Sequence, residues 1–214
     1  MAEWKKPLLI GVGWGLGTAV GLAILAGGFL WYESRSKPTV TSLASSTGSS
    51  SISVPRGITG LGVGMTPQQI GQLFTIKEAQ DPVVMLLKKY GKPDQAEVVS
   101  RQNEAIQKRY FSVSSGAGKL PDTVTSADAR ATHNIVYQIG LHYDEAIVKR
   151  LGWEGVTYPY VAKFGKPSED TGSAYVWKDG RTRLEIVSSG SIINVFFTDE
   201  ALEIEVKKEE RKNQ

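Results

Sequence analysis

The sequence predicts an α+β protein with an N-terminal transmembrane helix, a flexible linker, and then two tandem modules, each with two short helices packed on a small antiparallel sheet. Three observations lead to this prediction. Residues 8–32 carry no charge. Residues 39–53 are rich in Ser and Thr. The rest of the chain contains two similar stretches, LKKYGKPDQ at residues 87–95 and VAKFGKPSE at residues 161–169.

The predicted segments follow one another along the chain. They are a short flank at 1–6, a transmembrane helix at 7–33, a linker at 34–56, a first module at 57–143 with a loop at 114–133, a second module at 144–204, and a charged tail at 205–214. The linker is uncharged over its Ser/Thr-rich part, which is typical of a flexible tether.

The apolar segment 8–32 is long enough to cross a membrane. A helix of about 25 residues is roughly 37 Å long, and the hydrocarbon core of a bilayer is about 30 Å thick. Trp4, Trp31 and Tyr32 flank the segment, as interfacial aromatic residues do. The alternative is a cleaved signal peptide, whose apolar part is typically about 7–15 residues long. The length favours a retained anchor in the lipid bilayer.

Small residues recur every four positions within this span. They form two neighbouring ridges, one of Gly13, Gly17 and Gly21 and one of Gly15, Ala19, Ala23 and Gly27. Such ridges let helices approach closely in lipid, so they indicate a homo-oligomer formed through the span. The alternative is that the ridges contact only lipid.

The orientation of the span depends on its flanks. Two basic residues lie close to each end, so their count is nearly tied. We expect a cytoplasmic N-terminus and an extracytoplasmic C-terminal domain, because an N-terminal anchor preceded by two lysines commonly exports the rest of the chain. A bacterial inner membrane is the favoured location.

Each module is expected to contain a short helix, a second helix, a Gly-Lys-Pro stop, and then strands. In the first module, Thr66 followed by Pro67 and Gln69 predicts one helix start, and Asp81 predicts another. In the second, Asp144 begins a helix that ends at Gly152, and Pro159 begins the next. The predicted helix stops are Gly91, Pro93, Gly165 and Pro167.

The strands are predicted from alternating and β-branched residues. They are 105–113 and 134–143 in the first module, with 96–100 as a further candidate, and 175–177, 182–187 and 192–198 in the second, where Asp179-Gly180 predicts a hairpin turn. If the chain is duplicated, Gly91 should superpose on Gly165; the alternative is that a Gly-x-Pro stop occurs twice by chance. The expected core packs Val84, Leu87, Val161 and Phe164 against Trp177, Ile186 and Val195.

These motifs together resemble a known family. Gly64-Met65-Thr66 with Gln69, Gly91-Lys92-Pro93-Asp94, Gly165-Lys166-Pro167, Trp177 and Val195-Phe196-Phe197 are similar to the SmpA/OmlA (BamE-like) module of bacterial envelope proteins. A tandem arrangement also resembles the architecture of β-lactamase-inhibitor proteins. The lipoprotein cysteine typical of the envelope family is absent, so a role in outer-membrane assembly is not carried over. The resemblance implies a helix-plus-sheet module that binds protein.

The composition excludes several kinds of chemistry. The chain has no Cys, which removes disulfides, thiol nucleophiles and thiolate metal sites. Its net charge of +3 is too small to indicate nucleic-acid binding. His133 and His142 are spaced for a strand rather than for a shared helix face, so they do not form a zinc pair. We expect no catalytic residue, no cofactor and no metal.

The segment 114–133 is the best candidate for recognition. It is long for a loop between strands, and such loops are used for binding or are disordered. Its candidate partner-binding residues are Gly116, Lys119, Asp122 and Arg130. The predicted function is therefore a single-pass, membrane-anchored, non-catalytic protein that binds a protein partner in or near the same membrane. The alternatives are an anchored hydrolase that uses Ser and a lone His, and a secreted inhibitor-like protein.

Overall fold

The structure is a computed structural model and describes residues 53–213. The predicted span with its glycine ridges, and nearly all of the linker, lie outside the described residues. Among residues 53–213, no helix combines the length and the apolar character needed to cross a bilayer.

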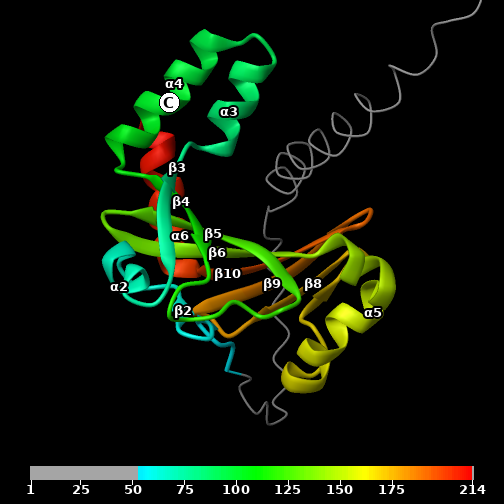
Figure 1. The fold of residues 1–214 in the computed structure, drawn as a ribbon. Coiled ribbons are helices and arrows are strands. Elements are labelled where there is room, and N and C mark those ends of the chain that lie inside the picture. Colours follow the sequence, from blue (N-terminus) through cyan, green and yellow to red (C-terminus); the bar gives the residue numbers. More distant parts are fainter. Residues whose placement is uncertain (1–52, 214) are drawn as a thin grey trace, which may run out of the picture. The chain divides into compact units, whose positions relative to one another are not determined.

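One continuous antiparallel sheet organises the domain (Figure 1). Its eight strands lie in the order β3 (Thr75–Ala79), β4 (Arg109–Ser114), β5 (Val124–Thr132), β6 (Ile135–Tyr143), β10 (Ile192–Asp199), β9 (Thr182–Ser189), β8 (Ala174–Lys178) and β7 (Glu169–Asp170). The prediction of two separate small sheets is therefore wrong. Each half supplies four consecutive strands, and the halves join where β6 pairs with β10. This junction removes two edges that separate sheets would have left unpaired.

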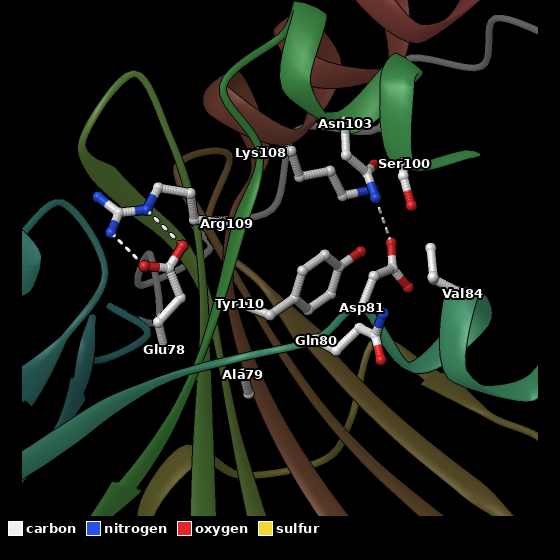
Figure 2. A pocket seen from close by; sticks show the side chains of 10 residues that line it. All are labelled: Glu78, Ala79, Gln80, Asp81, Val84, Ser100, Asn103, Lys108, Arg109 and Tyr110. Carbon is white, nitrogen blue, oxygen red and sulfur yellow. Dashed lines mark hydrogen bonds and ion pairs between the residues drawn. The ribbon is translucent and has the colours of Figure 1, made fainter. Parts of the chain in front are cut away.

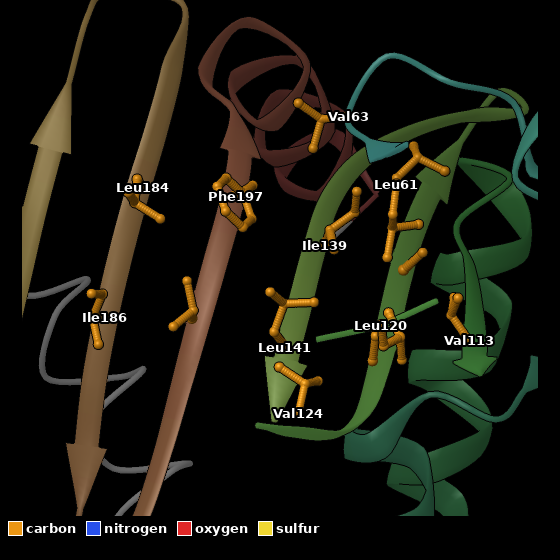
Figure 3. Close-up of a cluster of buried hydrophobic side chains, with 14 of the residues drawn as sticks. Leu61, Val63, Val113, Leu120, Val124, Ile139, Leu141, Leu184, Ile186 and Phe197 are labelled. Atoms are coloured by element: carbon orange, nitrogen blue, oxygen red, sulfur yellow. The ribbon is translucent and has the colours of Figure 1, made fainter. Parts of the chain in front are cut away.

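The main core lies on one face of this sheet. Ile139 and Leu141 of β6, Leu184 and Ile186 of β9, and Phe197 of β10 are buried there (Figure 3). This face is covered by α5 (Glu145–Phe164), α2 (Pro67–Gly71), and the segment that contains β1 (Gly57–Ile58) and β2 (Leu61–Gly62). We call it the core face.

Three predicted helix starts are confirmed. Thr66 caps α2 in a reciprocal capping box with Gln69. Asp81 caps α3 (Pro82–Lys89) by accepting a hydrogen bond from the backbone N–H of Val83 at 2.7 Å. Asp144 caps α5 in the same way. In each case a short side-chain oxygen satisfies a backbone donor that the helix itself leaves unpaired.

The two Gly-Lys-Pro stretches lead into different secondary structure. Gly91 follows α3 with φ 69°, and Gly165 ends α5 with φ 72°. Pro93, however, is the first residue of a further helix, α4 (Pro93–Ala105), so the predicted strand at 96–100 is wrong. Proline suits the first turn of a helix as well as it ends a preceding one. Gly91 thus leads into a helix and Gly165 into β7, and the expected equivalence of the two stretches does not hold.

Helices α3 and α4 form a hairpin that stands away from the sheet (Figure 1). Val84 is buried beside α4 rather than on Trp177, and Leu87 is only partly buried, so the predicted packing of α3 on the sheet is wrong. In the second half, Phe164 does pack edge-on against Trp177, with 6.2 Å between ring centroids. The hairpin interrupts the β3–β4 connection and has no counterpart in the second half.

Three further segments differ from prediction. Residues 124–132 of the expected loop form β5, which leaves a loop of residues 115–123. The predicted end of the second module and the charged tail form one helix, α6 (Glu200–Lys212), which buries Val206. Helix α5 is broken at Gly152 (φ 67°), but Pro159 lies inside its second part instead of starting it. Lys207 and Glu203 form an ion pair between successive turns of α6, which adds a little to the stability of this charged helix.

Candidate functional site

The second face of the sheet is polar, and α6 covers only part of it. The Arg183 guanidinium on β9 donates to both carboxylate oxygens of Glu203 on α6, at 2.9 and 3.0 Å. Val206 of the same helix packs with Tyr137 and Ile106. Beyond α6 lies a band of exposed or half-exposed side chains, which we call the open strip: Ser126 and Asp128 of β5, His142 of β6, Phe196 of β10, and Glu185 and Val187 of β9.

His142 is held from both sides within the open strip. Its Nε2 lies 2.6 Å from Oδ1 of Asp128, and its Nδ1 lies 2.7 Å from Oδ1 of Asn194. The three residues come from adjacent strands, and Asn194 is the register partner of His142. Asp128 is the register partner of Gly140, so its carboxylate reaches His142 across the space above that glycine. A Cβ at position 140 would lie 2.4 Å from the Asp128 oxygen.

These contacts favour the protonated imidazole. The hydrogen bond to Asp128 raises the pKa of His142 above its ordinary value, the Asn194 contact acts in the same direction, and burial opposes both. When the imidazole is protonated, both ring nitrogens donate, one to each oxygen. In that form neither nitrogen can accept a proton from a nucleophile, which is the task of the histidine in a serine-hydrolase arrangement.

We call Asp128, His142 and Asn194 together the clamp. Glu185 lies beside it and is a second group whose pKa is shifted. Desolvation raises the pKa of the Glu185 carboxyl, although the nearby Arg183 opposes this shift. Phe196 is its register partner on β10 and separates it from Gly140. The strip therefore combines an aromatic ring, an imidazole held between two oxygen acceptors, and carboxyl groups on a rigid sheet, which is a composition suited to recognition.

The hollow at the base of the α3–α4 hairpin is a structural joint (Figure 2). Its volume is about 130 Å³, well below the roughly 300–1,000 Å³ of ordinary ligand pockets. Asp81 already accepts hydrogen bonds from Val83 N–H and from Asn103 Nδ2, the latter at 2.6 Å. Glu78 is engaged by Arg109 at 2.9 and 2.6 Å. The two acidic residues of the hollow thus stabilise the base of the hairpin: Asp81 through Asn103 of α4, and Glu78 through Arg109 of β4.

The candidate residues of the 114–133 segment do not form one surface. Gly116, Lys119 and Asp122 are exposed on the shortened loop. This loop lies along the end of α2, where Gly118 N–H donates to Leu73 O at 2.6 Å, and it inserts Leu120 into the core. Arg130 lies on β5 instead, with its guanidinium 5.5 Å from the Tyr110 ring centroid. The four residues are therefore split between the loop and the polar face.

His133 has a local role in the turn between β5 and β6. It has φ 47°, and the next residue, Asn134, has φ 62°, which is the backbone of a tight two-residue hairpin turn. Within residues 53–213, no group of three or more His, Asp or Glu side chains is arranged to hold a metal ion.

Comparisons with known proteins give no family. No family model, no curated protein and no solved structure matches this chain.

Sequence reasoning missed the clamp because its three members come from three strands and from both halves of the chain. One signal was present: Gly140, His142 and Asn194 lie among mostly apolar residues of their strands. The contact of Asn194 with His142 depends on the β6–β10 pairing, which two separate sheets would not have produced.

Proposed function

We propose that this protein is a non-catalytic protein-binding module, held at a membrane by its N-terminal segment, and that its partner docks on the open strip. The observation that supports this proposal is the double engagement of His142 by Asp128 and Asn194. It makes the strip a fixed set of polar groups around Phe196, in which each ring nitrogen of His142 already has an oxygen partner.

The rigidity of the strip supports binding over catalysis. Its side chains stand on β5, β6, β9 and β10 at the centre of the sheet, with a continuous core beneath them. A preorganised surface loses little conformational entropy on association. Aromatic residues such as Phe196 are enriched at the centre of protein interfaces, whose rim is polar.

Site-specific photo-crosslinking in membranes tests the proposed partner. A photoreactive phenylalanine analogue is placed at Phe196 in the full-length protein, and a matched variant carries it at Tyr158, which is 72% exposed on α5 and thus on the side of the core face. A discrete adduct with a second protein is expected at position 196 and not at 158. The same adducts at both positions, or none at 196, would refute docking on the strip.

The hydrolase alternative has its own assay. Ser126 is the register partner of His142 on β5 and is the hydroxyl most directly placed for it. The purified chain should hydrolyse simple aryl esters no faster than its His142→Gln or Ser126→Ala variants. An activity that both substitutions abolish would replace the binding proposal with catalysis.

A further inference from the structure

The α3–α4 hairpin exposes an apolar stripe that the domain does not use. Val83, Leu86, Leu87 and Tyr90 lie at helical spacing along one side of α3. Val83 is 52% exposed and Tyr90 49% exposed, while the two leucines are partly exposed. Only Val84 of α3 and Ala96 of α4 are buried. More apolar surface is therefore presented to the outside than the contact between the two helices requires.

The end of this hairpin is basic. Lys88, Lys89 and Lys92 surround Tyr90 in the connection between α3 and α4, and all four are exposed. None of the three lysines forms an ion pair with another residue of 53–213. Figure 1 shows this connection at the end of the hairpin that lies away from the sheet. We call residues 88–92 the hairpin tip.

Apolar side chains next to lysines and an exposed tyrosine match the interface of an anionic bilayer. Lysines are attracted to anionic headgroups while their aliphatic stems cover apolar surface. Tyrosine is favoured at headgroup level because its ring is apolar and its hydroxyl is polar. A partly exposed apolar stripe can then enter the boundary between headgroups and acyl chains.

We propose that the hairpin tip and the apolar stripe of α3 form a second membrane contact, which docks on an anionic lipid surface. This inference rests on the membrane attachment in the proposed function. It assigns the hairpin to lipid and leaves the open strip to the protein partner. Three lysines near the surface, each contributing about a five-fold preference, favour an anionic over a neutral bilayer by roughly 100-fold.

The absence of cysteine from the chain permits a clean test. The full-length protein is reconstituted with a single environment-sensitive fluorophore at Tyr90→Cys. Membranes are phosphatidylcholine alone, or phosphatidylcholine with about one third phosphatidylglycerol. Matched labels are placed at Tyr158→Cys on α5 and at Ala23→Cys within the apolar segment.

The inference predicts a blue shift at position 90 in the anionic membrane and little in the neutral one, with no shift at position 158. Charge reversal by Lys88→Glu, Lys89→Glu and Lys92→Glu should remove that shift. Reversal of Arg150, Lys163 and Lys166 around α5, the matched control, should keep it. High salt should weaken the shift, because screening shortens the Debye length from about 10 Å at 0.1 M to about 3 Å at 1 M.

The fluorophores at positions 23 and 90 distinguish the membrane attachment of the N-terminal segment from the membrane contact of the hairpin. If position 23 reports lipid and position 90 does not, the hairpin contact is refuted and the membrane attachment stands. If position 23 reports water while position 90 still shifts on added anionic vesicles, the attachment is refuted and the hairpin contact stands. A shift at position 90 that is equal in both lipids refutes recognition of anionic headgroups. A shift that occurs only in native membranes containing other proteins assigns the hairpin to a protein partner and also overturns the inference.

Discussion

Replacing Gly140 with alanine should break the contact between Asp128 and His142 while leaving both residues unsubstituted. The new Cβ would lie 2.4 Å from Oδ1 of Asp128 and 3.1 Å from Cε1 of Phe196, whereas ordinary contacts begin at 3.4 Å. The carboxylate oxygen must therefore retreat by about 1 Å. Since it now lies 2.6 Å from Nε2 of His142, a retreat of this size takes it beyond hydrogen-bond distance.

The expected cost in stability is modest. A half-exposed charged contact contributes up to about 1 kcal/mol, and the forced shift of Phe196 adds to its loss. Alanine recovers about 0.5–1 kcal/mol of strand preference over glycine, which offsets part of this. With about 1 kcal/mol for the overpacking at Phe196, we expect a net loss of about 1 kcal/mol, or roughly 2–4 °C in Tm for a domain of this size.

The decisive assay is an NMR titration of the two histidine side chains. In the Gly140→Ala variant the pKa of His142 should fall towards its ordinary value, because the Asp128 hydrogen bond is the main cause of its rise. His133 is the internal reference. Gly71→Ala is the matched control, because a Cβ there meets Ile76 only at 3.4 Å. A His142 titration that is unchanged by Gly140→Ala would refute the clamp.

Three other predictions concern the same domain. Trp177→Ala should lower the free energy of unfolding by about 3–5 kcal/mol in urea titrations, because the ring is 1% exposed; a loss below 1 kcal/mol would show that the site repacks. Thr66→Ala should cost about 1 kcal/mol through the lost capping box of α2, whereas Thr66→Ser should cost little in the same titration. His142 has a raised folded-state pKa, so its contribution is complete below its ordinary value of 6.5 and is lost as pH rises through the raised value. Thermal melts from pH 5 to 9 should show this loss in the parent protein and a smaller loss in Asp128→Asn, where the Asn194 contact remains; equal pH dependence in both would contradict the assignment.

Local signals in the sequence predicted the ends of helices and the positions of turns better than they predicted which strands pair with each other. The capping box at Thr66 and the turn at Asp179-Gly180 are set by side chains within four residues of one another, and both are found as predicted. The β6–β10 junction joins segments more than fifty residues apart, and no local pattern specifies it. Pro93 is ambiguous in sequence because proline both follows one helix and begins the next.

The half of the candidate site that Asn194 supplies followed from that junction and could not be predicted without it, whereas Asp128 reaches His142 across the β5–β6 pair. His142 was correctly placed on a strand and outside the core face. Its partners Asp128 and Asn194 come from a segment expected to be a loop and from the other half of the chain. Val84 and Leu87 of α3 were expected to pack on the sheet because helical periodicity shows which residues share a side, and does not show what covers that side.

The α3–α4 hairpin enters and leaves the sheet at nearly the same place. Ala79 of β3 and Tyr110 of β4 are register partners. The segment between them, which contains α3 and α4, is therefore the loop of a β-hairpin formed by β3 and β4. The entropy of closing such a loop grows only with the logarithm of its length, by about 0.6 kcal/mol for each doubling. The sheet is therefore nearly indifferent to the length of what is inserted there. A short turn from Ala79 to Tyr110 would close the same strand pair, so the part of the hairpin beyond its contact with α6 through Ile106 can change in length without redesign of the sheet.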